Sequence, residues 1–326
     1  MKFLLWGWLA AMSAAGAATG NGYVYTRVGN AGDSTARPAA GYFLAGGGTD
    51  LDEGFRWLCG KANGGDFLIL RATGDDAYNA YVRGLCPALN SVATLVVSSR
   101  EGARDAFVAE TVRHAEALFI AGGDQANYLN YWQGSTLQDE MNALIARGAP
   151  VGGTSAGVDV MGEFVYSALR DTVTSAEALG DPFHERVTLA RHFLKIPVLA
   201  GIITDAHLAA RDRMGRDVVF LGRIAAQDWT GEPKGIFIDE KTAVLVEGDG
   251  KATVVGAGAA YFVRGPGKPE NCAPGEPLTF HRVAVYRVRM GGGFQVLLWS
   301  GTGGTDYAYD VEKGDLKSTQ AGGGIY

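Results

Sequence analysis

The chain lacks several features that mark common classes of protein. Its 326 residues include only three cysteines and five histidines, and its formal net charge is −6. No two cysteines have the close spacing of paired metal ligands and the histidines are scattered, so we expect no metal site. A modest negative charge without long blocks of one sign argues against a nucleic acid as the main partner.

Long apolar runs are also missing. The chain begins with Lys2, a short apolar stretch and small residues at 14–18, a pattern that is typical of a signal peptide cleaved near Ala17 or Ala18. The apolar stretch is short for a membrane span, and no cysteine lies near the cleavage region to carry a lipid. The sequence therefore predicts a signal peptide at residues 1–18, a secreted or periplasmic protein, and no membrane contact after the peptide is removed.

An oxidising compartment would permit disulfide bonds. Cys59 can then pair with Cys86 and leave Cys272 free, although the sequence does not fix the pairing. The oligomeric state is open as well, and a homodimer is one of the states that the sequence allows.

Glycine, in contrast, is abundant, with 48 residues. Many glycines follow short apolar runs that alternate with segments of helical spacing. Such runs occur at 41–45, 66–71, 93–97, 117–121, 150–151 and 200–204. The alternation predicts an α/β fold with a parallel sheet covered by helices. The glycine-rich and polar clusters then fall at the carboxyl edge of the strands, where such folds place their sites.

The pattern becomes β-rich after about residue 223. Residues 235–239 and 243–246 are expected to form a hairpin joined by Glu240 and Lys241. We expect the main α/β domain to span 38–250 and a β-rich C-terminal extension or subdomain to span 251–326. The glycine-rich tail of this extension, residues 320–326, is expected to fray.

A Gly-x-Ser-x-Gly motif at 153–157 follows one of the apolar runs. Such a motif forms a nucleophile elbow, a sharp turn that raises the serine hydroxyl above the edge of a sheet. Residues 158–166 are expected to continue as a helix. The motif alone fits an ordinary glycine-rich turn equally well, so the role of Ser155 depends on its surroundings.

A catalytic serine needs a base and an acid that orients the base. His207 is the best candidate for the base, because it follows a buried apolar run and has Asp205 close by. The acid is expected between Ser155 and His207. Glu177 is preferred there, and the remaining candidates are Asp171, Asp181 and Glu185.

Other residues would bind the reacting group and the substrate. The backbone amides of Ala156 and of Gly123 or its neighbour are expected to stabilise the oxyanion. Guanidinium groups bind carboxylates through two parallel hydrogen bonds, which predicts a substrate with free carboxylates. Gln125 would offer a neutral hydrogen-bonding group on the opposite wall. The guanidinium groups belong to three residues beyond the candidate base: Arg211, Arg213 and Arg216.

Three motifs together resemble the cyanophycinase branch of the S51 serine peptidases, which also includes aspartyl dipeptidases. They are Gly-Gly-Asp-Gln at 122–125, Gly-Gly-Thr-Ser-Ala-Gly at 152–157, and Asp-Ala-His at 205–207 followed by Arg-x-Arg-x-x-Arg at 211–216. The similarity covers about residues 41–248. It implies a flavodoxin-like fold similar to the class I glutamine amidotransferases, with serine in place of their cysteine.

The resemblance also implies a substrate and a set of site residues. The substrate would be cyanophycin, a poly-aspartate backbone with arginine on each side chain, and the products would be β-aspartyl-arginine dipeptides. By position, Ser155 matches the nucleophile, His207 the base and Gln125 the substrate-binding glutamine. The matching substrate-side residues are Asp205, Arg211, Arg213 and Arg216.

The sequence thus predicts an exported serine peptidase that acts on cyanophycin-like β-aspartyl peptides through an acyl-enzyme, without a metal or cofactor. Glu177 would hold the imidazole of His207. One alternative is an α/β-hydrolase esterase that uses the same serine with the later His281. Another is a non-catalytic protein whose arginines capture an acidic ligand.

Overall fold

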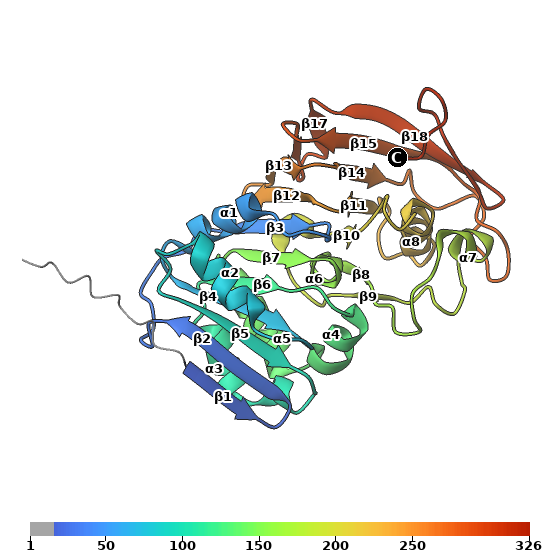
Figure 1. The fold of residues 1–326 in the computed structure, drawn as a ribbon. Coiled ribbons are helices and arrows are strands. Elements are labelled where there is room, and N and C mark those ends of the chain that lie inside the picture. The colour runs from blue at the N-terminus through green and yellow to red at the C-terminus, as the bar shows by residue number, and fades with distance from the viewer. Residues whose placement is uncertain (1–15) are drawn as a thin grey trace, which may run out of the picture.

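The computed structural model describes residues 16–326, whose strands form two sheets (Figure 1). The predicted signal peptide therefore lies outside the described residues except for its last three positions. Among the described residues, none of the helices has the length and apolar character needed to cross a membrane.

The first sheet contains the parallel core of the fold. Its strands are, in spatial order, β1 (Gly16–Gly20), β2 (Tyr23–Gly29), β5 (Ser91–Val97), β4 (Asp66–Arg71), β6 (Ala117–Ile120), β7 (Val151–Thr154), β3 (Gly41–Ala45), β12 (Thr242–Glu247), β13 (Lys251–Gly256), β16 (Gly293–Gln295) and β17 (Ser300–Thr302). The five consecutive strands from β5 to β3 run parallel to one another, and the outer strands are antiparallel. The predicted α/β fold is confirmed.

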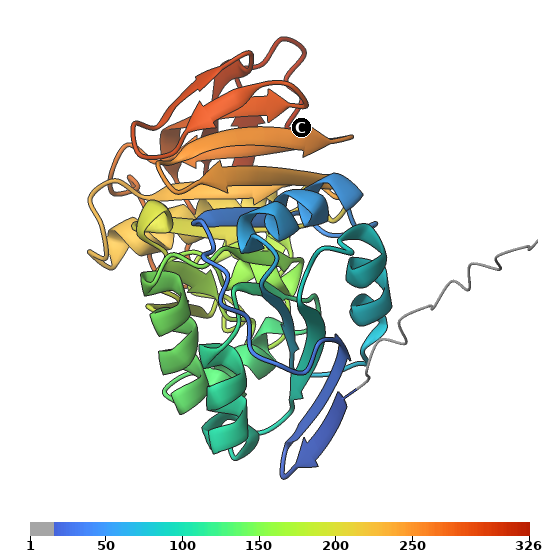
Figure 2. The same cartoon turned by 90° about the vertical axis from the view of Figure 1, so that its left-hand side faces the viewer.

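The second sheet lies beside the first and is mostly antiparallel. It contains β19 (Asp315–Ser318), β18 (Thr305–Glu312), β15 (Phe280–Arg289), β14 (Ala259–Arg264), β11 (Lys234–Ile238), β10 (Ile202–Asp205), β8 (Phe164–Tyr166) and β9 (Leu189–Arg191). Strand β10 pairs in parallel with β11 and with β8, and the remaining pairs of this sheet are antiparallel. The strands after residue 250 thus continue both sheets, and in the figures they gather at one end of the molecule, in orange to red (Figures 1 and 2).

Helices cover the parallel strands on both faces. The helices are α1 (Asp52–Ala62), α2 (Ala77–Leu85), α3 (Ala106–Arg113), α4 (Gln125–Trp132), α5 (Thr136–Ala146), α6 (Ala156–Asp159), α7 (Ser175–Gly180) and α8 (Met214–Ala226), with short 3-10 turns at Gly102–Arg104 and Pro197–Leu199. Strand β4 is apolar between its charged ends because it is covered on both faces: Phe67 and Ile69 pack in the cluster with α1 and α2, whereas Leu68 and Leu70 pack in the cluster with α3, α4 and α5. A strand buried on both faces has no polar side.

Two expectations about local structure are wrong. The helix expected over 158–166 ends at Asp159, because the aromatic and β-branched residues of β8 pair with β10 instead. The hairpin expected around Glu240 does not form, since β11 and β12 belong to different sheets. Each of these strands finds a partner elsewhere: β11 pairs with β10 and β14, and β12 with β3 and β13.

A buried disulfide and a packed C-terminal tail further restrain the fold. Cys59 of α1 forms a disulfide with Cys86, directly after α2, and Cys272 is free. The tail expected to fray is instead held by contacts, because Ile325 and Tyr326 pack against the core of the second sheet.

Candidate active site

The turn around Ser155 has the backbone of a nucleophile elbow. Ser155 joins β7 to α6 with φ 53° and ψ −126°, a conformation that non-glycine residues rarely adopt. Its glycine neighbours are required by packing. A Cβ atom on Gly153 would lie 2.5 Å from the carbonyl oxygen of Gly157, and one on Gly157 would lie 2.0 Å from that of Ile120. The motif therefore encodes this sharp turn against β6.

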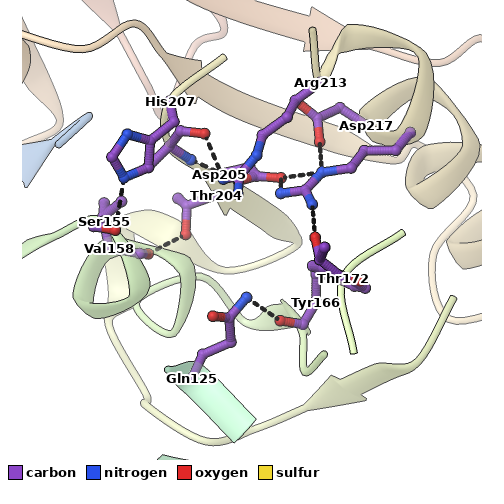
Figure 3. A network of polar contacts seen from close by, with 12 residues as sticks. Gln125, Ser155, Val158, Tyr166, Thr172, Thr204, Asp205, His207, Arg213 and Asp217 are labelled. Atoms are coloured by element: carbon purple, nitrogen blue, oxygen red, sulfur yellow. Dashed lines mark hydrogen bonds and ion pairs between the residues drawn. The ribbon is translucent and has the colours of Figure 1, made fainter. Parts of the chain in front are cut away.

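His207 lies directly against the serine. Ser155 Oγ is 2.7 Å from His207 Nε2, and a dashed line marks this contact in Figure 3. The loop after β3 supports the histidine, because the amide of His207 donates to the carbonyl oxygen of Gly46 at 2.8 Å. Gly47 leaves room for the ring: a Cβ there would lie 2.4 Å from His207 Cε1. The elements that carry the pair are also tied together, since the buried hydroxyl of Thr204 in β10 donates to the carbonyl oxygen of Val158 in α6 at 2.6 Å.

The acid behind the histidine is Glu240 rather than Glu177. Glu240 Oε1 is 2.6 Å from His207 Nδ1, and Glu240 lies directly beyond the carboxyl end of β11. Glu177 forms a capping box with Thr174 at the start of α7 and pairs with Arg186 at 3.0 Å, so its carboxylate already has partners away from the site. The sequence places Glu240 just after an apolar run, as it does His207. Glu240 was nevertheless missed, because it was assigned to the turn of a hairpin.

The other candidates for the acid and for the base make no hydrogen bond with Ser155 or His207 within residues 16–326. Asp171 and Asp181 accept hydrogen bonds from the nearby amides of Thr172 and Phe183. His281, which an esterase mechanism would use, is on β15 and contacts Glu270 and Glu312. The geometry therefore supports His207 as the partner of Ser155.

Electrostatics favour a neutral imidazole. Burial lowers the pKa of His207 from its ordinary value, Arg211 and Arg213 lower it further, and the hydrogen bond to Glu240 offsets only part of this effect. The same hydrogen bond lowers the pKa of Glu240. A neutral imidazole beside an ionised carboxylate donates its Nδ1 proton to Glu240 and can accept the serine proton at Nε2.

Two amides near the serine are available to bind an oxyanion. Ala156 is the first residue of α6, and Gly123 follows β6 in the adjacent loop. Within residues 16–326, neither amide donates a hydrogen bond to another group. The intervening Gly122 lies against the serine, since a Cβ there would be 3.3 Å from Ser155 Cβ. Both expected donors therefore lie close to the serine, one at the start of α6 and one in the loop after β6.

The arginines beyond His207 divide into buried and exposed residues. Asp205, at 1 % exposure, accepts hydrogen bonds from Arg213 Nη1 at 3.0 Å and from Arg216 Nε at 3.1 Å. Arg216 is also 1 % exposed, and its guanidinium group further contacts the hydroxyl of Thr172, the carboxyl group of Asp217 and the rings of Tyr166 and Phe220. Asp205 and Arg216, expected to bind substrate, therefore form a buried ion pair beneath the site.

This buried cluster also contains two further carboxyl groups, those of Asp159 and Asp217, which are 3 % and 0 % exposed. Burial opposes ionisation of Asp205, yet Arg216 and Arg213 lower its pKa to about 2. Burial, together with the negative Asp205, raises the pKa values of Asp159 and Asp217 well above the ordinary value. The arginines therefore favour the ionised form of Asp205, whereas burial opposes ionisation of its two carboxyl neighbours.

A cavity of about 560 Å³ opens at the loop that carries Gly123, and no member of the triad is among the residues that line it. Gly123 and Gln125 form one wall, Arg211 and Arg213 another, and the segment 168–175 contributes further lining. Gln125 Nε2 makes a long contact of 3.4 Å with the carbonyl oxygen of Tyr166. Arg211 is exposed, and it has no ion-pair partner in the described part of the chain. It is thus the arginine most available to a ligand carboxylate.

Known proteins share the fold and the sequence pattern. The cyanophycinase of Trichormus variabilis is 27 % identical over 210 residues, 63 % of this chain and 65 % of that protein. The cyanophycinase of Synechococcus elongatus is 26 % identical over 176 residues, 54 % of this chain and 50 % of that protein. The chain thus spans less than two thirds of the length of these curated relatives.

A solved structure is similar over a larger share of the chain. The crystal structure of a peptidase from an acI-B1 actinobacterium has a TM-score of 0.53 and 17 % identity, covering 79 % of this chain and 98 % of that one. It has the same fold. The profile of peptidase family S51 matches residues 71–254, more than half of the sequence. The chain therefore belongs to peptidase family S51.

Proposed function

We propose that this chain is an exported serine peptidase that hydrolyses cyanophycin or related β-aspartyl peptides to β-aspartyl-arginine dipeptides. The observation that carries the proposal is the aligned triad: 2.7 Å from Ser155 Oγ to His207 Nε2 and 2.6 Å from His207 Nδ1 to Glu240 Oε1. The curated relatives named cyanophycinase support the substrate.

The reaction follows from the positions of the three side chains. His207 takes the proton of Ser155 as Oγ attacks the scissile carbonyl carbon, and the amides of Gly123 and Ala156 stabilise the resulting oxyanion. His207 then gives the proton to the leaving amine, which leaves an acyl group on the serine. A water molecule, deprotonated by His207, releases the acyl group. Throughout, Glu240 fixes the ring and stabilises the imidazolium.

The cavity suits a substrate that carries free carboxylates. In a cyanophycin-like polymer each arginine unit keeps its own carboxylate, so the substrate presents anionic groups at regular intervals. Arg211 is exposed and has no ion-pair partner within residues 16–326. A guanidinium group in that position would bind such a carboxylate.

Export is part of the same proposal. The charged and apolar start of the chain supports it, and so does the disulfide between Cys59 and Cys86, because such bonds persist mainly in oxidising compartments.

Release of dipeptide from cyanophycin by the purified protein tests the activity. We expect Ser155→Ala to lower the rate by about a thousandfold or more, because the nucleophile is lost. His281→Ala is the matched control and should retain full activity, since His281 lies away from the site. Full activity of Ser155→Ala, or no dipeptide from the wild type, would contradict the proposal. A parallel assay on α-aspartyl peptides and a small ester defines the preferred bond.

A further inference from the structure

The last described residue, Tyr326, contacts the loop that carries Arg211 and Arg213. Tyr326 lies 114 positions beyond Asp212 in the chain, yet its hydroxyl donates a hydrogen bond to Asp212 Oδ1 at 2.7 Å. The same hydroxyl accepts a hydrogen bond from the amide of Met214 at 3.2 Å. One phenol therefore links Asp212 to the first residue of α8.

The core of the second sheet sets the position of this phenol. Tyr309, a buried residue of β18, donates a hydrogen bond to the carbonyl oxygen of Ile325. The ring of Tyr326 meets that of the buried Tyr261 edge-on, with 6.5 Å between the ring centres. Gln320 Nε2 closes the tail by donating to the carbonyl oxygen of Gly324 at 2.7 Å. The tail is thus a packed segment, and it places the hydroxyl of Tyr326 against Asp212.

The carboxylate of Asp212 is placed where it would affect ligand binding. Asp212 lies between Arg211 and Arg213 in the chain, and all three residues line the 560 Å³ cavity. Arg213 pairs with Asp205, whereas Arg211 has no such partner within residues 16–326. A free Asp212 carboxylate could pair with Arg211 and cancel the charge that an anionic ligand requires.

We propose that Tyr326 is a positioning residue for substrate binding. Its hydroxyl holds the Asp212 carboxylate away from Arg211, and this leaves Arg211 free for a carboxylate of the substrate. Tyr326 acts through Asp212 and makes no contact with the reacting atoms. The inference rests on the proposed function, because it assumes an anionic substrate in this cavity.

Tyr326→Phe tests the inference, because it removes the hydroxyl and keeps the ring beside Tyr261. We expect KM for cyanophycin to rise about three- to fivefold, the size of effect that an exposed ion pair produces, with kcat unchanged. The double variant Tyr326→Phe/Asp212→Asn should return KM to the wild-type value, since asparagine cannot neutralise Arg211. A loop that was merely displaced would not be rescued in this way.

Tyr81→Phe is a matched control, because Tyr81 of α2 also donates its hydroxyl to an aspartate, Asp52 at 2.8 Å, and does not line the cavity. An unchanged KM in Tyr326→Phe, or a double variant no better than the single one, overturns the inference.

Calorimetric binding of β-aspartyl-arginine to Ser155→Ala, with and without Tyr326→Phe, separates this inference from the proposed function. A weaker Kd in the double variant supports the tail contact even if the wild type does not turn over. Absence of binding to Ser155→Ala itself overturns both ideas, and equal Kd values overturn only the role of Tyr326.

Discussion

Glu240 and Glu177 show how position in the fold, rather than residue type, assigns a role to a carboxylate. Glu240 stands at the end of a strand beside the parallel strand that delivers His207, so it reaches Nδ1 at 2.6 Å. Glu177 stands at the start of α7, where the amide of Thr174 at 2.9 Å and Arg186 bind its two oxygens. Because both of its oxygens already have partners at the start of α7, the carboxylate of Glu177 does not orient His207.

The triad makes a prediction about Glu240→Gln. We expect kcat to fall by about three to four orders of magnitude, because the amide no longer holds the productive tautomer of His207. Glu240 raises the pKa of His207, so its loss should move the acid limb of the kcat/KM profile to lower pH. In the wild type that limb should already lie below the ordinary histidine value of 6.5, because burial lowers the pKa. A pH profile of both proteins measures the two effects.

Glu177→Gln is the matched control for this experiment. It removes the same charge from a residue outside the site, so kcat and the pH profile should stay at wild-type values. A large loss of kcat in Glu177→Gln with little loss in Glu240→Gln would reverse the assignment of the acid.

At the scale of elements, the elbow depends on two close backbone approaches. Gly157 leaves no space for a side chain, since a Cβ atom would lie 2.0 Å from the carbonyl oxygen of Ile120. We expect Gly157→Ala to push α6 away from β6, to lower the free energy of unfolding by about 1–3 kcal/mol and to abolish activity. Thermal unfolding and dipeptide release measure these effects.

Gly84 of α2 offers the opposite control. A Cβ atom there meets no other atom within 4 Å. Because alanine favours helix formation over glycine, Gly84→Ala should raise the free energy of unfolding by about 0.5–1 kcal/mol and leave activity unchanged. Similar losses in both variants would mean that the close approach at Gly157 is unimportant.

The strands of the parallel core could be predicted because each is a continuous apolar run that ends in glycine or polar residues. The runs expected at 41–45 and 66–71 coincide with β3 and β4. The serine and the histidine were found for the same reason, since each directly follows such a run. Glu240 also follows one, but local spacing suggests a hairpin, and only long-range pairing shows that β11 and β12 separate. Pairing between distant segments is not encoded in the local pattern of a single sequence.

At the scale of the whole molecule, the triad lies where the two sheets meet. Ser155 follows β7 of the first sheet, His207 follows β10 of the second, and Glu240 lies in the turn that leads from β11 in the second sheet to β12 in the first. The catalytic distances therefore depend on the relative position of the two sheets.

A chain that ends at residue 250 tests this dependence. Such a truncation removes β14, the antiparallel partner of β11, and exposes the edge of the strand that precedes Glu240. We expect the shortened protein to be insoluble or to lack both a cooperative unfolding transition and activity. A soluble, active fragment would instead establish residues 38–250 as an independent domain. Circular dichroism and the dipeptide assay distinguish the two outcomes.

The segment 168–175 lines the cavity, yet it contributes no member of the triad. Within it, Ala168 and the exposed Leu169 line the cavity. Thr172 instead accepts a hydrogen bond from Arg216, and Thr174 caps the start of α7. Variation at Ala168 and Leu169 would therefore alter which side chains a peptide may carry while the bond-breaking chemistry stays constant. These two positions are where a directed library, or divergence between paralogues, would most directly change substrate preference.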